Sequence, residues 1–255
     1  MKNYFLAIDI GNTQISFGFF QNDEVICRFD LDTHLAEEEL KIAIRNAINE
    51  TNCPKEGVSD GLIGSVVPSV TSVIAKEIKS IFGFDIAILN NEINKEVKMD
   101  IDNPLEVGAD ILADIVAATN LYKSPIVVTD LGTITKYIVI DENKSFIGTS
   151  FYPGVKGSLK AMGQNTALLP NLDTIKEFDH PYGKNTVDSM VSGVYFGTVS
   201  SVLGINNILD KQFNMPVSHV LTGGYSNLIH KEFESFIFDK DLTLKGLYLL
   251  KKGIR

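Results

Sequence analysis

The sequence predicts an α/β protein made of two related halves, with a ligand-binding cleft between them. The main observation is a repeated unit: residues 4–24 and 126–144 both run as an apolar strand, a D-x-G turn, an alternating strand and a polar turn. A single D-x-G turn is common, whereas two in the same setting half a chain apart indicate an internal duplication. The second observation is that predicted strands and amphipathic helices alternate in both halves, as in α/β folds. Ligands prefer clefts between domains, so the duplication also predicts where a ligand binds.

The first half begins with three strands. Apolar and alternating runs predict strands over residues 4–10, 14–20 and 25–29, and later over 60–66 and 86–89. Helices are predicted over 36–50 and 70–82, because apolar residues such as Leu40, Ile44 and Ala47 recur there at helical spacing. A third helix is predicted over 108–122, and the two domains are assigned as residues 1–114 and 115–255.

The second half repeats the strand pair at 126–140. It continues with a long helix over 186–213, a strand over 217–222, a helix from Ser226 and a last helix over 242–252. In the long helix, Gly193 and Gly197 are four residues apart and share one helix face, and Gly204 follows. Because glycine lowers helix stability, either another backbone or a ligand is expected to pack closely there.

The bulk composition excludes several classes of protein. The 255 residues carry a formal net charge of −9, which argues against a nucleic-acid binder with a broad basic surface. The longest apolar runs are too short to cross a bilayer, and the first residues lack a signal-peptide pattern, so we expect a cytoplasmic protein without membrane contact. Cys27 and Cys53 form no C-x-x-C motif, and we expect two separate thiols rather than a disulfide or a zinc site.

The common phosphate-binding loops are absent from the sequence. No two glycines lie two positions apart, which excludes the G-x-G loops of Rossmann folds and protein kinases. The pair Gly183-Lys184 is followed by Asn185 and lacks the upstream glycine of a P-loop. The four histidines, His34, His180, His219 and His230, have no metal-ligand spacing.

The two D-x-G hairpins are an alternative phosphate site. A tight turn with glycine exposes backbone N–H groups to phosphate oxygens, and the neighbouring aspartate can hold a hydrated cation. Asp9 and Asp130 would also suit simple hairpin turns, but the duplication favours binding of a polyphosphate by both. Thr222-Gly223-Gly224 is a third turn of this kind, and it is equally explained as the entry to a helix.

Asp110 is the candidate base. It lies at the predicted start of a helix, where the macrodipole favours acids for purely structural reasons. The proton of the nucleophile leaves late in a loose phosphoryl-transfer transition state, so a weak but well-placed base is sufficient. Asp114 is predicted to share this helix face one turn later.

These segments resemble the type III pantothenate kinases. The matching segments are DIGNT at 9–13, GSVVPSV at 64–70, NPLEVGAD at 103–110, DLGT at 130–133, PG at 153–154, ALLP at 167–170, NTVDSMVSGVYFG at 185–197, TGG at 222–224 and LTLKGL at 242–247. They follow in family order over nearly the whole chain.

The resemblance implies two duplicated actin-like (ribonuclease H-like) domains with a nucleotide cleft between them. It implies ATP-dependent phosphorylation of pantothenate to 4′-phosphopantothenate, the first step of coenzyme A biosynthesis, in a cytoplasmic homodimer. The cofactors would be ATP with Mg²⁺ and a monovalent cation, K⁺ or NH₄⁺.

The resemblance also assigns roles to individual residues. Asp110 would be the catalytic proton acceptor, and Asp130 would bind the monovalent cation. The ATP site would comprise Asp9, Ile10, Gly11, Asn12, Thr13, Gln14, Ile15, Ser16, Gly132, Thr133, Gly223 and Gly224. The pantothenate site would comprise Ile101, Gly108, Ala109, Asp110, Ile111 and Thr186.

The chain departs from the family pattern mainly on the acceptor side. Ile111 replaces the arginine of G-A-D-R, Ile101 replaces a usual tyrosine, and Lys136 ends a segment that is typically G-T-A-T-T. Loss of a charged hydrogen bond costs about 1.5–3 kcal/mol. Three interpretations therefore stay open: an active pantothenate kinase that uses another cation such as Lys136, Lys156 or Lys160; a kinase for a different small alcohol; and a nucleotide-binding paralogue without turnover that acts as an accessory or regulatory protein.

Overall fold

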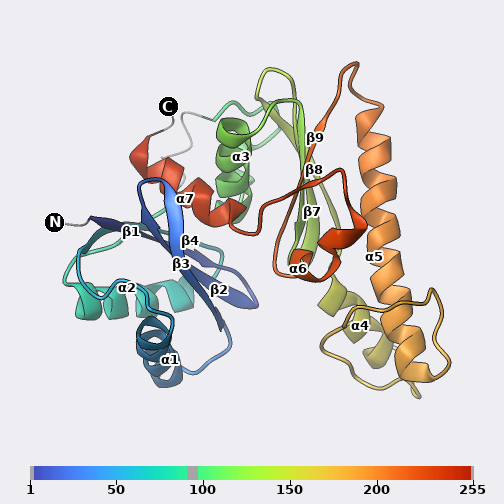
Figure 1. Cartoon of the computed structure of the whole chain (residues 1–255), viewed down its shortest axis with the longest axis horizontal. Helices are drawn as coiled ribbons and strands as arrows, with labels where there is room; N and C mark the ends of the chain where they lie inside the picture. Colours follow the sequence, from blue (N-terminus) through green and yellow to red (C-terminus); the bar gives the residue numbers. More distant parts are fainter. Residues whose placement is uncertain (1–2, 91–96, 254–255) are drawn as a thin grey trace. The chain divides into compact units, whose positions relative to one another are not determined.

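The computed structural model describes residues 3–90 and 97–253 and divides into two compact units, each containing one five-stranded sheet (Figure 1). The first unit takes its described residues from the ranges 1–98, 102–121 and 241–255, and the second from 99–101 and 122–240. The division expected between residues 114 and 115 falls inside helix α3 (Ala109–Leu121), which lies whole in the first unit.

The first sheet has the strand order β3-β2-β1-β4-β5. Its strands are β1 (Tyr4–Ile10), β2 (Gln14–Gln21), β3 (Glu24–Asp32), β4 (Val58–Ser65) and β5 (Ala87–Ile88). β2 lies antiparallel to β1 and β3, whereas β4 lies parallel to β1 and β5. This sheet places the turn between β1 and β2 beside the carboxyl end of β4, where Val66 donates its backbone N–H to the Ile10 carbonyl at 3.1 Å.

Helices cover both faces of the first sheet because side chains alternate along its strands. Leu6, Ile8 and Ile10 of β1 pack in a core that includes α1 (Glu37–Glu50) and α2 (Pro68–Phe82). Phe5 points to the opposite face, where its ring meets Tyr248 of α7 (Leu242–Lys252) with centroids 5.2 Å apart. Helix α7 also packs against α3. In the chain, α3 follows the short 3₁₀ helix η2 (Pro104–Glu106).

The second sheet has the order β10-β9-β6-β7-β8, which repeats the topology of the first strand for strand. Its strands are β6 (Ile126–Leu131), β7 (Ile134–Ile140), β8 (Phe146–Pro153), β9 (Ser218–Thr222) and β10 (Ile237–Phe238). β6 pairs antiparallel with β7 and parallel with β9, as β1 does with β2 and β4. The predicted duplicated α/β fold is therefore confirmed.

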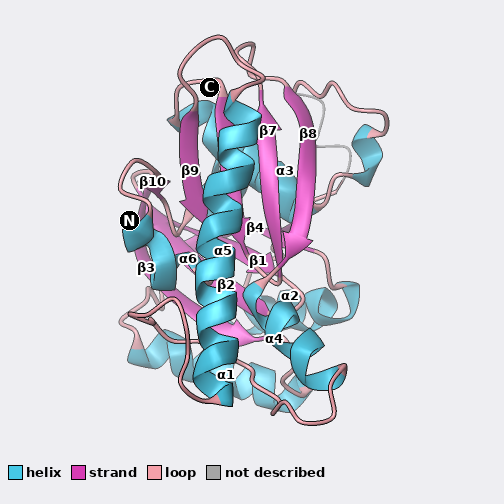
Figure 2. Cartoon of the chain, turned by 90° about the vertical axis from the view of Figure 1, so that its right-hand side faces the viewer, coloured by secondary structure: helices cyan, strands magenta, loops and turns pink. Residues whose placement is uncertain are grey.

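The helices of the second unit are α4 (Val155–Gln164), α5 (Thr186–Asp210), α6 (Ser226–Ile229) and the 3₁₀ helix η3 (His230–Glu232). Figure 2 shows α5 in front of the second sheet, running along its strands, and Asn206 of α5 donates a hydrogen bond of 3.1 Å to the Thr129 hydroxyl of β6. At Gly193, Gly197 and Gly204 an added Cβ would meet no atom within 4 Å among the described residues. The expectation that another backbone of the chain packs on this face is therefore wrong.

Other differences from the sequence predictions concern short or weakly patterned elements. Strand β8 was not predicted, since five of its eight residues in a row are exposed and give no alternation of burial. Helix α4 was not predicted either, because Gly157 and Gly163 interrupt its pattern. The expectation of two separate thiols is wrong: Cys27 and Cys53 form a disulfide, since β3 and the segment after α1 bring their Cα atoms to 5.4 Å.

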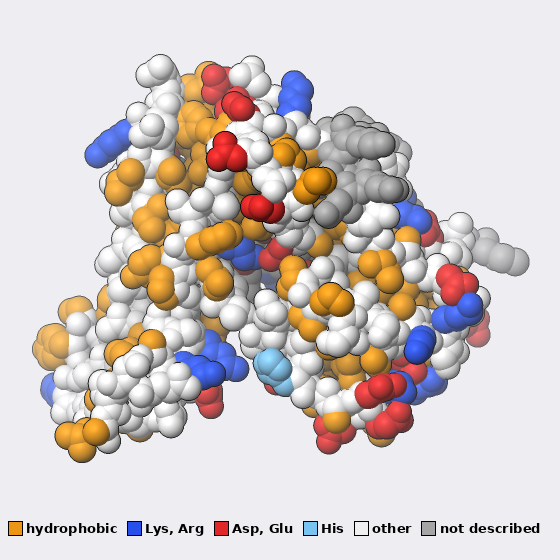
Figure 3. Space-filling model, turned by 180° about the vertical axis from the view of Figure 1, so that it is seen from behind, with side chains coloured by type: hydrophobic (Ala, Val, Ile, Leu, Met, Phe, Trp, Pro, Cys, Tyr) orange, Lys and Arg blue, Asp and Glu red, His pale blue; other side chains and the backbone are white. Residues whose placement is uncertain are grey.

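The surface shows no single dominant charged region on the face drawn in Figure 3, where Lys and Arg side chains lie in small separate groups. Across the part of the chain that the structure describes, no helix combines the length and apolarity needed to span a membrane.

Candidate active site

The first D-x-G hairpin is the turn between β1 and β2. Asp9 lies half-buried in β1 opposite Ser16, and the backbone N–H of Gly11 donates to the Gln14 carbonyl at 3.0 Å. Thr33, directly after β3, donates its hydroxyl to the Gly11 carbonyl at 2.8 Å and so fixes the turn from the side. Asn12 is exposed at the tip.

The rest of the predicted phosphate loop runs into β2. Thr13 accepts the Thr33 backbone N–H at 3.1 Å, and the Gln14 amide donates to the Ser16 hydroxyl at 3.3 Å. Ile10 and Ile15 are fully buried, so their side chains belong to the core and only their backbone can serve a ligand. The hairpin is thus a rigid turn with polar groups at its exposed end.

The second D-x-G hairpin has the same form in the second unit. Asp130 is paired across the strands with Lys136, around a turn in which Gly132 is half-buried and Thr133 is exposed. The Lys136 ammonium lies 2.5 Å from Asp130 Oδ2, and both side chains are largely buried, with 13% and 10% exposed. Burial raises the pKa of the neighbouring Tyr137 phenol.

The Thr222-Gly223-Gly224 turn packs directly on the second hairpin. Gly223 has φ +92°, a left-handed conformation that favours glycine, and an added Cβ would overlap Asp130 Oδ1. The Tyr225 backbone N–H donates to the Leu131 carbonyl at 3.1 Å, and Gly224 is exposed beside it. The three-residue turn, which was weak evidence in the sequence, therefore belongs to the same local site as Asp130.

Asp110 lies in the first turn of α3, as predicted. The Gly108 carbonyl accepts the Leu112 N–H at 3.0 Å and starts the helix, and Ala109 is its first residue. Asp110 is partly exposed, and its Oδ1 accepts the Ile111 backbone N–H at 2.9 Å. A partly exposed carboxylate at a helix N-terminus is accessible to a polar substrate.

The two neighbours of Asp110 on α3 are both buried. Ile111 is only 8% exposed, so this departure from the family arginine forms part of the core. Asp114 is completely buried, and its Oδ1 accepts the Thr243 hydroxyl at 2.7 Å. The second carboxylate of this helix therefore serves the contact between α3 and α7.

The remaining predicted pantothenate residues, Ile101 and Thr186, belong to the second unit. Ile101 is partly exposed after the bridge that Met99 forms with Phe146. Thr186 begins α5 behind the N-cap Asn185, whose side chain accepts the Asp188 N–H at 2.9 Å.

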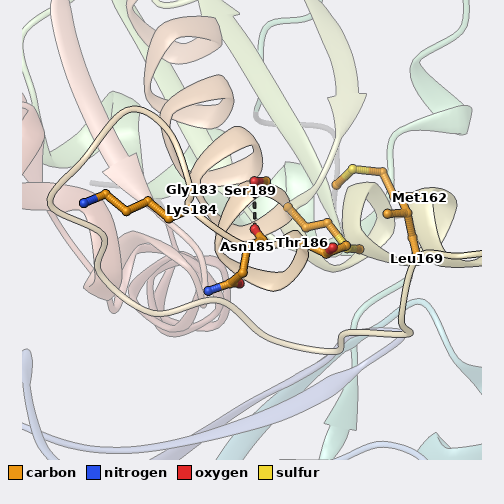
Figure 4. A pocket seen from close by; sticks show the side chains of 8 residues that line it. Met162, Leu169, Gly183, Lys184, Asn185, Thr186 and Ser189 are labelled. Carbon is orange, nitrogen blue, oxygen red and sulfur yellow. Dashed lines mark hydrogen bonds between the residues drawn. The ribbon is translucent and has the colours of Figure 1, made fainter.

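Thr186 lines a pocket of about 520 Å³ (Figure 4). The other lining residues are Met162, Leu169, Gly183, Lys184, Asn185, Ser189 and Met190. Sequence reasoning missed Lys184, whose only signal was an incomplete P-loop pattern. It also missed the pairing of Lys136 with Asp130, which could have been found by counting outward from the hairpin turn.

Known proteins resemble the chain over its length. Residues 5–207 match the family model described as type III pantothenate kinase. Proteins named type III pantothenate kinase from Finegoldia magna and Agathobacter rectalis are 35% and 32% identical, over 98% of this chain and 97% and 99% of theirs.

Solved structures share the fold at low sequence identity. The ethanolamine utilization protein EutJ from Carboxydothermus hydrogenoformans has a TM-score of 0.56 at 11% identity, covering 98% of this chain and 90% of that one. Component A of the (R)-2-hydroxyglutaryl-CoA dehydratase from Acidaminococcus fermentans has a TM-score of 0.54 at 14% identity, covering 98% of both chains. The family match over residues 5–207 and the two relatives that are 35% and 32% identical show that the chain belongs to the type III pantothenate kinase family.

Proposed function

We propose that the chain transfers the terminal phosphoryl group of ATP to the primary alcohol of pantothenate, the first step of coenzyme A biosynthesis. Membership of the kinase family is the observation that carries the proposal. The two glycine-containing hairpins and the partly exposed Asp110 supply groups of the kinds that this reaction needs.

ATP binding is assigned to the turns of both hairpins. Glycine turns present backbone N–H groups to phosphate oxygens, and Asn12, Thr13 and Thr133 add polar side chains. The assigned residues are Asp9 to Ser16, Gly132, Thr133, Gly223 and Gly224. The exposure of Asn12, Thr133 and Gly224 agrees with a role in ligand contact.

The Mg²⁺ of the nucleotide is assigned to Asp9. Mg²⁺ keeps several waters and binds through one or two carboxylates plus substrate phosphates, so a single carboxylate at a phosphate-binding turn fits this ion. Within residues 3–90 and 97–253, no three or more His, Cys, Asp or Glu side chains form a cluster that could hold a metal. When bound, Mg²⁺ would neutralise charge that develops on the transferred group.

Asp110 is assigned as the proton acceptor for the pantothenate alcohol. In a loose transition state a weak base is sufficient if it is placed at the reacting hydroxyl. The first turn of α3 holds the Asp110 carboxylate in a fixed position, which supports its role as the proton acceptor.

Pantothenate binding is assigned to Ile101, to the helix start Gly108–Ile111 and to Thr186. Ile111 has no donor for the pantothenate carboxylate, so a cation elsewhere has to replace the family arginine. Lys184 lines the same pocket as Thr186 and is exposed, which makes it the best-placed cation for this contact.

The carboxylate oxygens of Asp130 are not suited to bind the monovalent cation that the family resemblance implies. The Lys136 ammonium already lies 2.5 Å from Asp130 Oδ2. On the other side, Gly223 packs against Asp130 Oδ1 so closely that even a methyl group would overlap it. A free cation bound by this carboxylate would have to share it with a fixed positive charge.

The chain is further proposed to act as a cytoplasmic homodimer. Phe151 and Tyr152 of the edge strand β8 are 62% and 41% exposed, and a second copy would cover such side chains. Sedimentation equilibrium tests the dimer: a monomer at micromolar concentration would contradict it. Cell fractionation tests the compartment.

The proposed reaction is tested by incubating the purified protein with ATP and pantothenate and measuring 4′-phosphopantothenate directly by mass spectrometry. Direct detection avoids coupling enzymes with salt requirements of their own. We expect product with the wild type, none with Asp110→Asn, and wild-type rates with the exposed control Asp85→Asn. Failure of the wild type to form product under any salt condition, while it still binds ATP, would overturn the proposal.

A further inference from the structure

The family pattern has a threonine where this chain has Lys136, and we infer that the Lys136 ammonium group replaces the free monovalent cation beside the second hairpin. The chain would then phosphorylate its substrate without K⁺ or NH₄⁺. The inference rests on the proposed nucleotide binding at this hairpin, and its activity test rests also on the proposed kinase function.

The ion pair of Lys136 with Asp130 is built into the sheet. The two residues are direct cross-strand partners of β6 and β7, in a ladder that continues from Leu131 opposite Thr135 to Ile126 opposite Ile140. Residues directly opposite each other on adjacent strands hold their side chains together on one face of the sheet. The backbone register therefore fixes the ammonium at the carboxylate, with Nζ and Oδ2 2.5 Å apart.

The surroundings of the carboxylate keep this arrangement in place. The side chains of Asp130 and Lys136 are only 10% and 13% exposed, so water competes little with the ion pair. Gly223 packs against Oδ1, which restricts rotation of the carboxylate. Such a pair differs from exposed surface pairs, which contribute little and exchange partners easily.

The chemistry of the ammonium group matches the ion it would replace. A lysine side chain ends in a compact, strongly hydrated unit charge with three donors, which makes it a tethered analogue of NH₄⁺. A second monovalent cation bound by the same carboxylate would lie about 4–7 Å from Nζ. Repulsion over that range weakens binding by about fiftyfold to a thousandfold at an effective dielectric constant of about 20.

The hairpin needs a positive charge at this place if it binds phosphates. Asp130 lies two residues before Gly132 in the turn, and an uncompensated carboxylate there would repel a polyphosphate. A neutralising cation removes this repulsion. Lys136 provides that charge from the chain itself.

The activity test compares K⁺-free and K⁺-containing buffers at constant ionic strength, with tetramethylammonium chloride as the replacement salt. We expect the wild-type rate to change by less than about twofold, because Lys136 already supplies the charge. Lys136→Thr, which restores the residue typical of the family, is expected to lose about a hundredfold in K⁺-free buffer and to recover with KCl or NH₄Cl. Lys231→Thr, at an exposed ion pair of the same unit, is the matched control and should behave as the wild type.

A binding test decides the inference even if no turnover is found. The unfolding temperature is measured with ATP in KCl and in tetramethylammonium chloride, since a bound ion stabilises the folded state. We expect the same temperature in both salts for the wild type and a higher one in KCl for Lys136→Thr. Lys136→Gln is a second variant in case the threonine variant does not fold.

Several results would overturn the inference. One is a wild type that K⁺ stimulates tenfold or more, and another is a Lys136→Thr enzyme that is fully active without K⁺. A third is K⁺-specific stabilisation of the wild type equal to that of the variants. Absence of turnover in every protein and salt would instead refute the proposed function and leave the binding test to decide the role of Lys136.

Discussion

The contact between α3 and α7 gives the sharpest prediction for stability. Gly246 of α7 lies at the closest approach: an added Cβ would overlap the Ala113 carbonyl oxygen and lie 2.8 Å from the Ala113 Cα. Cβ atoms in proteins essentially never approach another atom below 3.0 Å. The obstructing atoms are helix backbone, which cannot rotate away as a side chain can. Gly246→Ala therefore has to push the two helices apart.

The magnitude follows from what α7 buries. Overpacking a well-packed site costs about 1–3 kcal/mol and occasionally more. The upper end applies here, because Leu244, Leu247 and Tyr248 of α7 are all at most 3% exposed and move with the helix. Alanine is a better helix former than glycine, which offsets about 1 kcal/mol of this loss in stability. The net loss of about 2 kcal/mol corresponds to a fall of about 4–8 °C in Tm for a chain of this size.

Thermal unfolding followed by circular dichroism measures this loss. The matched control is Gly197→Ala in α5, where an added Cβ meets nothing within 4 Å among the described residues; it should leave Tm unchanged or raise it slightly. Because Ala113 lies three residues after Asp110 in α3, Gly246→Ala should also lower turnover. A Tm for Gly246→Ala equal to that of the control would refute the close approach of the helices.

Three further predictions concern individual polar groups. Thr243→Val removes the hydroxyl that donates to the buried Asp114 and should cost about 1.5–3 kcal/mol of stability in urea unfolding, whereas Thr243→Ser should cost much less; equal losses would contradict the hydrogen bond. Asp110→Asn should abolish phosphoryl transfer while calorimetry still detects ATP binding, and normal turnover would exclude Asp110 as the base. Lys184→Ala should raise KM for pantothenate about tenfold or more with little change in KM for ATP, and an unchanged value would remove Lys184 from the substrate pocket.

Local patterns in the sequence were sufficient for the parts of the fold that repeat. The two hairpins, the helix behind Gly108 and the start of α5 at Thr186 all lie where the patterns predicted them. These elements are specified by residues close together in the chain: glycine turns, alternating strands and capping side chains. The short strand β10 and helix α4 lack such signals.

Contacts between distant segments could not be predicted from the sequence. Asp114 was expected to share a ligand-facing side of α3 with Asp110, because helical spacing places both on one side. The structure instead gives Asp114 a partner in Thr243, 129 residues later. The pattern of a helix shows that one face is buried, and it does not show which element covers that face.

The assignment of α7 to the first unit has a consequence for synthesis of the chain on the ribosome. The sheet of the first unit emerges early, yet the helix that covers Phe5 comes only with residues 242–252, about 120 residues after α3. At about 5–20 residues per second, this delay lasts roughly 6–24 seconds. During that time the second unit can fold from one almost uninterrupted stretch, whereas the first exposes apolar surface to chaperones and to aggregation.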